Sequence, residues 1–243
     1  MAPNLNGPTT RFSAMRRTAI HTWQDRIRDP SLTALLILQI GALFVAVPLA
    51  AQGRPVARIV GESLVLAVVL IVVTLSHRPG AIFVILMGLL ATGASLWPLP
   101  PLTQALLGRG GSILTFSALS WVVAYAVYAP GRITLRRLQG AVVLYLNLGT
   151  IFASAFHLIW EISPDAFEHV GIASPGRGPS QIAVMLYFSF TTLTTTGYGD
   201  LIPVSPFARS LANLEAVIGQ FFLAITVARL VTLELEDRRR GRP

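Results

Sequence analysis

The chain has 243 residues, of which 53% are hydrophobic and only 12% are charged, and its mean hydropathy is +0.64. A soluble globular domain usually carries about 25% charged residues, so this composition excludes an ordinary soluble protein and indicates an integral membrane protein. The absence of cysteine excludes disulfides and cysteine-ligated metal sites. The formal net charge of +8 is typical of nucleic-acid-binding proteins, but the positions of the arginines point to a different cause.

Six apolar segments are long enough to cross a bilayer, which takes about 20 residues of helix. They are expected approximately at Leu32–Ala51, Val56–Ser76, Gly80–Trp97, Ser112–Tyr128, Leu138–Ile162 and Pro206–Leu233. Glycine and proline clusters such as WPLPP separate them. A seventh apolar segment, Ser180–Thr192, is too short to cross. We therefore predict an all-α membrane protein with six transmembrane helices and one re-entrant helix.

The distribution of arginine indicates the orientation, because cytoplasmic loops collect positive charge. All 19 basic residues are arginine, and 14 of them fall on the inner side if the N-terminus is cytoplasmic. Both termini are therefore predicted in the cytoplasm, in a multi-pass protein of the cell (inner) membrane. The positive charge then reflects topology and contact with anionic inner-leaflet lipid, so no nucleic-acid partner is expected. Arg229 and the basic tail are expected to extend to the inner headgroups.

The sequence TTLTTTGYGD at 191–200 places hydroxyl and glycine residues in an otherwise apolar region. It follows the short apolar segment and lies in the external connection between the fifth and sixth spans, so it enters and leaves the membrane from outside. Non-helical backbone at this depth is tolerated where protein buries it or water lines it. Its glycines permit left-handed dihedral angles, and carbonyls from several copies could replace the hydration shell of a cation. The stretch therefore predicts an ion-binding segment.

Residues 195–200, TTGYGD, resemble the potassium-channel filter signature, and the resemblance extends over about 138–235, most closely to the bacterial two-helix pore module. It implies a filter made of Thr195, Thr196, Gly197, Tyr198 and Gly199. Permeant K⁺ would bind the backbone carbonyls of 195–198 and the Thr195 hydroxyl, and Asp200 would brace the outer end. A ring of four such loops implies a homotetramer, with no cofactor. Thr196 departs from the usual Val or Ile, and Thr191 stands where some relatives carry a bracing Glu.

Further residues are predicted to support or gate this pore. Thr194 and Glu215 are expected to support the filter, and an acid such as Glu215 inside a membrane segment is functional by default. We expect Glu215 to hydrogen-bond the region of the pore helix. Gly219 is either a gating hinge or a small residue that allows close helix packing. Four residues are expected to form either an acidic external mouth or a merely solvated loop: Glu161, Asp165, Glu168 and His169.

The chain divides into four predicted regions: a cytoplasmic N-terminus with a basic amphipathic helix (1–30), a four-helix transmembrane domain (31–131), a pore domain (132–235) and a basic tail (236–243). The four-helix domain has the position of a voltage sensor, but its predicted fourth span carries no basic residue. Each gating charge is worth about 2.3 kcal/mol per 100 mV, so strong voltage gating is not expected.

The predicted function is a potassium-selective channel that conducts passively, and not an enzyme, because no convincing nucleophile–base or metal-ligand set is present. A weakly selective cation channel is one alternative, although the tyrosine of the filter is the residue that such a variant would be expected to lose. A potassium transporter-like subunit is the other. One pore loop and no obvious repeat relating the two halves argue against the transporter.

Overall fold

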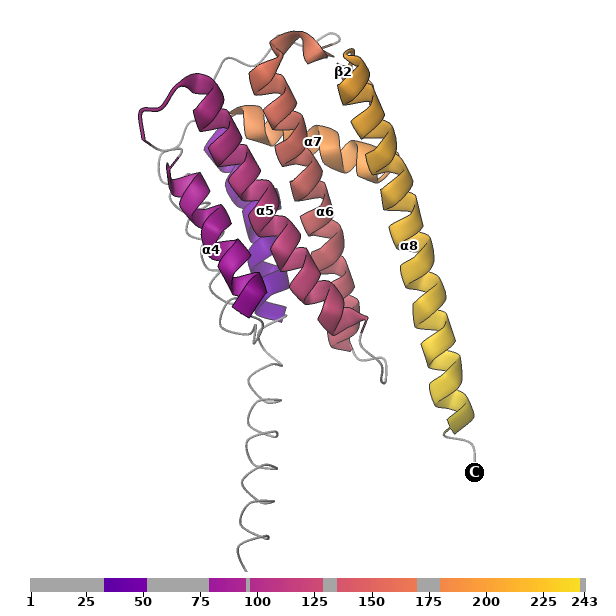
Figure 1. The fold of residues 1–243 in the computed structure, drawn as a ribbon. Helices are drawn as coiled ribbons and strands as arrows, with labels where there is room; N and C mark the ends of the chain where they lie inside the picture. The colour runs from indigo at the N-terminus through magenta and orange to yellow at the C-terminus, as the bar shows by residue number, and fades with distance from the viewer. Residues whose placement is uncertain (1–32, 52–78, 95–96, 129–134, 170–179, 241–243) are drawn as a thin grey trace, which may run out of the picture.

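The computed structural model describes residues 33–51, 79–94, 97–128, 135–169 and 180–240, and these ranges are mostly helical (Figure 1). The amphipathic helix predicted within 1–30 and the span predicted at Val56–Ser76 lie outside the described residues. Among the described helices, three are long and apolar enough to cross a membrane: Pro101–Tyr125, Arg137–Ile162 and Pro206–Arg229. The structure is therefore that of a helical membrane protein.

The first described helix runs from residue 33 to residue 51 and changes its winding near the middle. It is π-helical over Ala42–Ala46 and continues as α2 over Val47–Ala51. Pro48 explains the change, because proline has no amide hydrogen to donate and its ring collides with the carbonyl four residues earlier. A widened turn before the proline relieves that collision.

The next two described helices are α4, Pro79–Ala94, and α5, Pro101–Val127. The predicted start of the fourth span at Ser112 is wrong, because α5 begins at Pro101. Proline suits the first helical position, where its missing amide hydrogen would have had no partner in the helix. The glycines at 108 and 111 lie inside α5, and their carbonyls accept hydrogen bonds from the Ser112 and Thr115 hydroxyls. As a result Arg109 lies within the helix.

The remaining helices are α6, Leu135–Ile162, α7, Ser180–Leu193, and α8, Pro206–Arg240. The 14 residues of α7 rise about 21 Å, which is short of the roughly 30 Å of a hydrocarbon core. In Figure 1, α7 crosses behind α6 and ends beside α8. The end of α8 lies past the predicted Leu233, because its Leu, Glu and Arg residues favour helix even where they are charged.

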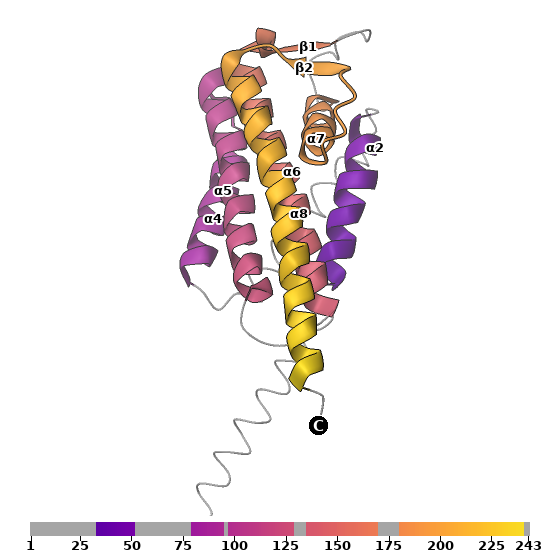
Figure 2. The same ribbon diagram turned by 90° about the vertical axis from the view of Figure 1, so that its right-hand side faces the viewer.

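A small antiparallel sheet joins the chain after α6 to the chain after the TTTGYGD segment (Figure 2). Strand β1, Phe167–His169, pairs with β2, Leu201–Pro203, with Phe167 opposite Pro203. The carbonyl of Ala166 also accepts the amide hydrogen of Val204 at 2.9 Å. The prediction of an all-helical chain missed this sheet, because strands of three residues are too short to show a period in the sequence.

An inner hydrophobic cluster packs the N-terminal helices against α6 of the same chain. Its buried members are Leu35, Ile85, Leu119, Val123, Val127, Ala141, Val143 and Leu144. A buried hydrogen bond of 2.7 Å from Gln39 Nε2 to Asn147 Oδ1 adds a polar link between the first helix and α6. The described N-terminal helices therefore pack against α6 of their own chain.

An outer hydrophobic cluster holds α7 in place between α6, α8 and the sheet. Its buried members are Phe152, Phe156, Ala166, Phe167, Met185, Phe188, Leu201, Ala208 and Ala212. Phe156 and Phe188 meet edge to face, with ring centroids 4.9 Å apart, a geometry that aromatic pairs favour. This cluster fixes α7 and therefore the segment that follows it.

Candidate selectivity filter

The TTTGYGD segment begins where α7 ends, and the carbonyl of Thr191 anchors the turn between them. That carbonyl accepts two amide hydrogens, from Thr196 at 2.8 Å and from Gly197 at 3.1 Å. The amide of Thr195 donates to the carbonyl of Thr192 at 2.9 Å. These bonds satisfy carbonyls that the last turn of a helix leaves unpaired, and they set where the next residues lie.

The sign of φ alternates along residues 195–199. Thr195, Gly197 and Gly199 have φ of +56°, +52° and +79°, whereas Thr196 and Tyr198 have negative φ. Thr195 is the only non-glycine residue with positive φ in the part of the chain that the structure describes. Alternating handedness turns successive peptide groups the same way, as in backbone nests. This alternation is the backbone pattern expected of a segment whose carbonyl oxygens line up on one side.

The threonine side chains around this segment hydrogen-bond to the end of α7 and to one another. The Thr194 hydroxyl donates to the carbonyl of Phe190 at 2.7 Å and lies 2.9 Å from the Thr196 hydroxyl. Thr194, predicted as a support, thus connects the pore helix to the position that departs from the family pattern. The hydroxyl of Thr191 is bonded to the carbonyl of Phe188 at 2.9 Å.

Asp200 joins the outer end of the segment to α7. Its Oδ2 accepts the hydroxyl hydrogen of Tyr187 at 2.8 Å, and its Oδ1 accepts the amide hydrogen of Leu201 at 3.0 Å. The rings of Tyr187 and Tyr198 are stacked, with centroids 6.1 Å apart and planes within 2°. Sequence reasoning did not single out Tyr187; a phenol in an apolar pore helix was the available signal.

Glu215 lies behind the segment and contacts α7. Its side chain is 0% exposed, and its Oε1 is hydrogen-bonded to the hydroxyl of Ser189. The same hydroxyl lies 2.7 Å from the carbonyl of Gly149 on α6. The predicted contact between Glu215 and the pore helix is thus present, and Ser189, which the sequence analysis did not single out, connects all three pore helices.

Gly219 marks the point where α8 touches the end of α7. A Cβ at this position would overlap the carbonyl oxygen of Leu193 and lie 2.9 Å from its Cδ1. The observed packing corresponds to the small-residue interpretation of Gly219, and its role as a hinge remains a prediction.

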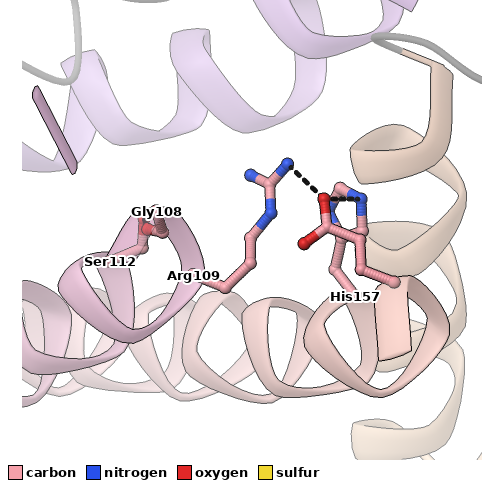
Figure 3. Close-up of polar contacts among 5 residues, drawn as sticks. Gly108, Arg109, Ser112 and His157 are labelled. Atoms are coloured by element: carbon pink, nitrogen blue, oxygen red, sulfur yellow. Dashed lines mark hydrogen bonds and ion pairs between the residues drawn. The ribbon is translucent and has the colours of Figure 1, made fainter. Parts of the chain in front are cut away.

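A polar cluster links the N-terminal half of α5 to the C-terminal end of α6 (Figure 3). Arg109 Nη2 lies 3.2 Å from Glu161 Oε1, and His157 Nε2 lies 3.5 Å from the same oxygen. Figure 3 shows the Arg109 guanidinium pointing to this carboxylate from α5. Of the four residues expected at an acidic mouth, Glu161 is therefore paired with an arginine, while Asp165 and Glu168 are exposed.

Arg229 on α8 contacts the C-terminal end of α5. Its Nη2 donates to the carbonyl of Tyr128 at 2.6 Å, and its guanidinium carbon lies 4.8 Å from the centroid of the Tyr128 ring. Arg229 therefore has a partner on α5, and its extension to the inner headgroups stays a prediction. A C-terminal helix carbonyl carries partial negative charge and attracts a cation. This contact ties the end of α5 to α8.

Comparison with known proteins adds independent evidence. The family model described as "Ion channel" matches residues 141–235. The chain is 36% identical over 33% of its length to the potassium voltage-gated channel protein shk-1 of Caenorhabditis elegans, and 32% identical over 35% of its length to the inward rectifier potassium channel Kirbac3.1 of Paramagnetospirillum magnetotacticum. It spans only 15% and 25% of those two proteins. A search of solved structures finds no significant match.

A viral relative is covered over most of its length. The chain is 32% identical, over 30% of its own length, to the potassium channel protein kcv of Paramecium bursaria Chlorella virus 1, of which it covers 76%. The region that the family model matches, 141–235, contains most of α6, all of α7, the TTTGYGD segment and most of α8. The predicted resemblance is thereby confirmed: the chain belongs to the potassium-channel pore family.

Proposed function

We propose that the protein is a potassium-selective channel in which K⁺ passes through the carbonyls of residues 195–198. The observation that carries the proposal is the alternating sign of φ over residues 195–199, a pattern that we take to turn successive carbonyls to one side. Oxygens arranged in this way replace the hydration shell of a K⁺ ion. The Thr195 hydroxyl is the proposed additional ligand at the inner end, and Asp200 and Glu215 brace the segment from its outer end and from behind.

The proposed assembly is a homotetramer with the pore on its axis, because one chain supplies one carbonyl row and a potassium filter uses four. The exposure of the segment supports this. Tyr198 is 70% exposed in the single chain, and residues 194–199 are all exposed. Irregular backbone at membrane depth needs protein or pore water around it, and three further copies would provide both.

The proposed topology has six spans with both termini in the cytoplasm of the cell membrane, in contact with anionic inner-leaflet lipid. Weak voltage dependence is part of the proposal. The fourth helix carries Arg109 at its outer end, but that charge is paired with Glu161 at 3.2 Å. A single paired arginine contributes at most about 2.3 kcal/mol per 100 mV in each subunit, whereas steep gating uses three or four charges.

The test is current through purified protein in a planar bilayer, with K⁺ on one side and Na⁺ on the other. We expect a reversal potential close to the potassium equilibrium value and openings that depend little on voltage. Gly197→Ala should abolish selectivity, because φ at this position is +52° and alanine resists it. Gly93→Ala is the matched control, since a Cβ there meets no atom within 4 Å.

A reversal potential near zero in the unaltered protein would overturn K⁺ selectivity and favour a weakly selective cation channel. Saturating K⁺ uptake into vesicles without measurable current would favour a transporter-like subunit. Steep voltage dependence would contradict the assignment of the fourth helix.

A further inference from the structure

Gln220 on α8 contacts the first residue of the candidate filter. Its Nε2 donates a hydrogen bond to Thr195 Oγ1 at 3.4 Å. The contact occurs where Gly219 lets the backbone of α8 meet the end of α7 at Leu193. Close packing at Gly219 therefore fixes where the backbone of the neighbouring Gln220 lies relative to the end of α7.

A carboxamide in this apolar part of α8 needs a hydrogen-bond partner. Residues 216–225 read AVIGQFFLAI, in which Gln220 is the one polar side chain. An amide left unpaired in hydrocarbon is strongly unfavourable. Gln220 is exposed in the single chain, so the part of its amide that does not contact Thr195 requires water or a neighbouring subunit. Its contact with Thr195 places it on the side of α8 nearest the proposed ion path.

Thr195 is the position at which such a contact has consequences. Its backbone is held at φ +56°, an uncommon conformation for a β-branched residue, and its amide donates to the carbonyl of Thr192 at 2.9 Å. A threonine hydroxyl has one hydrogen and two lone pairs. When one lone pair accepts the hydrogen of Gln220, the directions of the other lone pair and of the hydroxyl hydrogen are also constrained.

We infer that Gln220 is a positioning residue that orients the Thr195 hydroxyl toward an ion at the inner end of the filter. The inference rests on the proposed function, in which this hydroxyl is a K⁺ ligand. In the proposed tetramer, four carboxamides would hold four hydroxyls in the same orientation around the axis.

The test is block of K⁺ current by Ba²⁺ added from the cytoplasmic side, with the purified chain in planar bilayers. Ba²⁺ is close to K⁺ in size but carries two charges, so the proposed oxygen ligands should bind it more tightly than K⁺, and when added from the cytoplasmic side it would meet the inner end of the proposed path first. Gln220→Leu keeps the approximate size of the side chain and loses the donor. It should weaken block about fivefold, which corresponds to one ordinary hydrogen bond.

Gln220→Asn is the matched variant, because it keeps the carboxamide but is one methylene shorter. It should weaken block by a similar factor, since the amide no longer reaches Thr195. In a Thr195→Val background, which lacks the hydroxyl, adding Gln220→Leu should change block by less than about twofold, because the interaction is already absent.

Measuring the reversal potential of every variant in the same bilayers separates this inference from the proposed function. Unaltered protein without K⁺ selectivity would overturn the proposed function and this inference with it. Selective channels in which Gln220→Leu leaves Ba²⁺ block unchanged would overturn only the positioning role. The positioning role would also be overturned if Gln220→Leu weakened Ba²⁺ block while Gln220→Asn left it unchanged. The amide would then act without reaching Thr195.

Discussion

Substituting Glu215 tests how a buried carboxyl group is accommodated between the three pore helices. The Ser189 hydroxyl has a single hydrogen, yet it lies in bonding contact with both Glu215 Oε1 and the carbonyl of Gly149. Both contacts are satisfied when Glu215 carries a hydrogen and donates it to Ser189, which in turn donates to Gly149. Glutamine has the same size and an amide hydrogen to donate, so Glu215→Gln should preserve the chain of hydrogen bonds.

The expected changes in the free energy of unfolding follow from the burial of Glu215 and from its hydrogen bond with Ser189. Glu215→Gln should change the free energy of unfolding by less than about 1 kcal/mol, because a donor and the volume are both retained. Glu215→Ala removes one hydrogen bond, worth about 1 kcal/mol, and leaves a cavity at a side chain that is 0% exposed. Truncation of buried side chains adds about 2 kcal/mol or more. We therefore expect Glu215→Ala to destabilise the protein by about 3 kcal/mol.

The assay is unfolding of the purified protein in mixed micelles, followed by near-ultraviolet circular dichroism, with K⁺ current recorded for each variant. Leu214→Ala is the matched control, because Leu214 is the neighbouring residue on α8 and is 50% exposed; it should cost less than about 1 kcal/mol. If Glu215→Gln proves as destabilising as Glu215→Ala, the carboxyl group does not act as a donor and the reasoning is refuted.

Three other substitutions test single contacts. Tyr187→Phe removes the hydrogen-bond donor to Asp200 but keeps the ring. We expect the free energy of unfolding to fall by about 1 kcal/mol and the K⁺ current to decline faster. A current as steady as in the unaltered protein would contradict the bracing role. Gly219→Ala places a methyl group against the end of α7 and should destabilise the protein by about 1–3 kcal/mol. Its control is Gly93→Ala, which has open space around it and should be neutral or stabilise by up to about 1 kcal/mol. Equal melting temperatures for the two variants would be inconsistent with close packing at Gly219. Arg229→Lys keeps the charge but loses the planar guanidinium that contacts the end of α5. The free energy of unfolding should therefore fall by about 1–2 kcal/mol. An unchanged free energy of unfolding would show that the positive charge alone suffices.

The location of the candidate filter could be predicted from the sequence because its signal is local. Five threonines and two glycines in ten residues, at the end of a short apolar segment, specify backbone that neither a helix nor lipid accommodates. The same local evidence located the helical segments of the described chain. The predicted start of α5 was wrong because the glycines at 108, 110 and 111 resemble a break, whereas the helix begins at the proline at 101 and continues through them.

The contacts that hold the filter segment could not be predicted residue by residue, because each joins positions far apart in the chain. Ser189 meets Gly149 across 40 positions, Gln220 meets Thr195 across 25, and Arg229 meets Tyr128 across 101.

By itself, the sequence determined that this protein is a helical membrane protein with a potassium-channel-like segment near residue 195, since hydropathy and backbone freedom are properties of adjacent residues. Only the tertiary structure decided which polar side chains support that segment, that the small sheet connects α6 to its outer end, and that the N-terminal helices pack on their own α6. The physical reason is that a polar group in an apolar surrounding is stabilised by whichever partner the packing of helices brings within hydrogen-bonding distance.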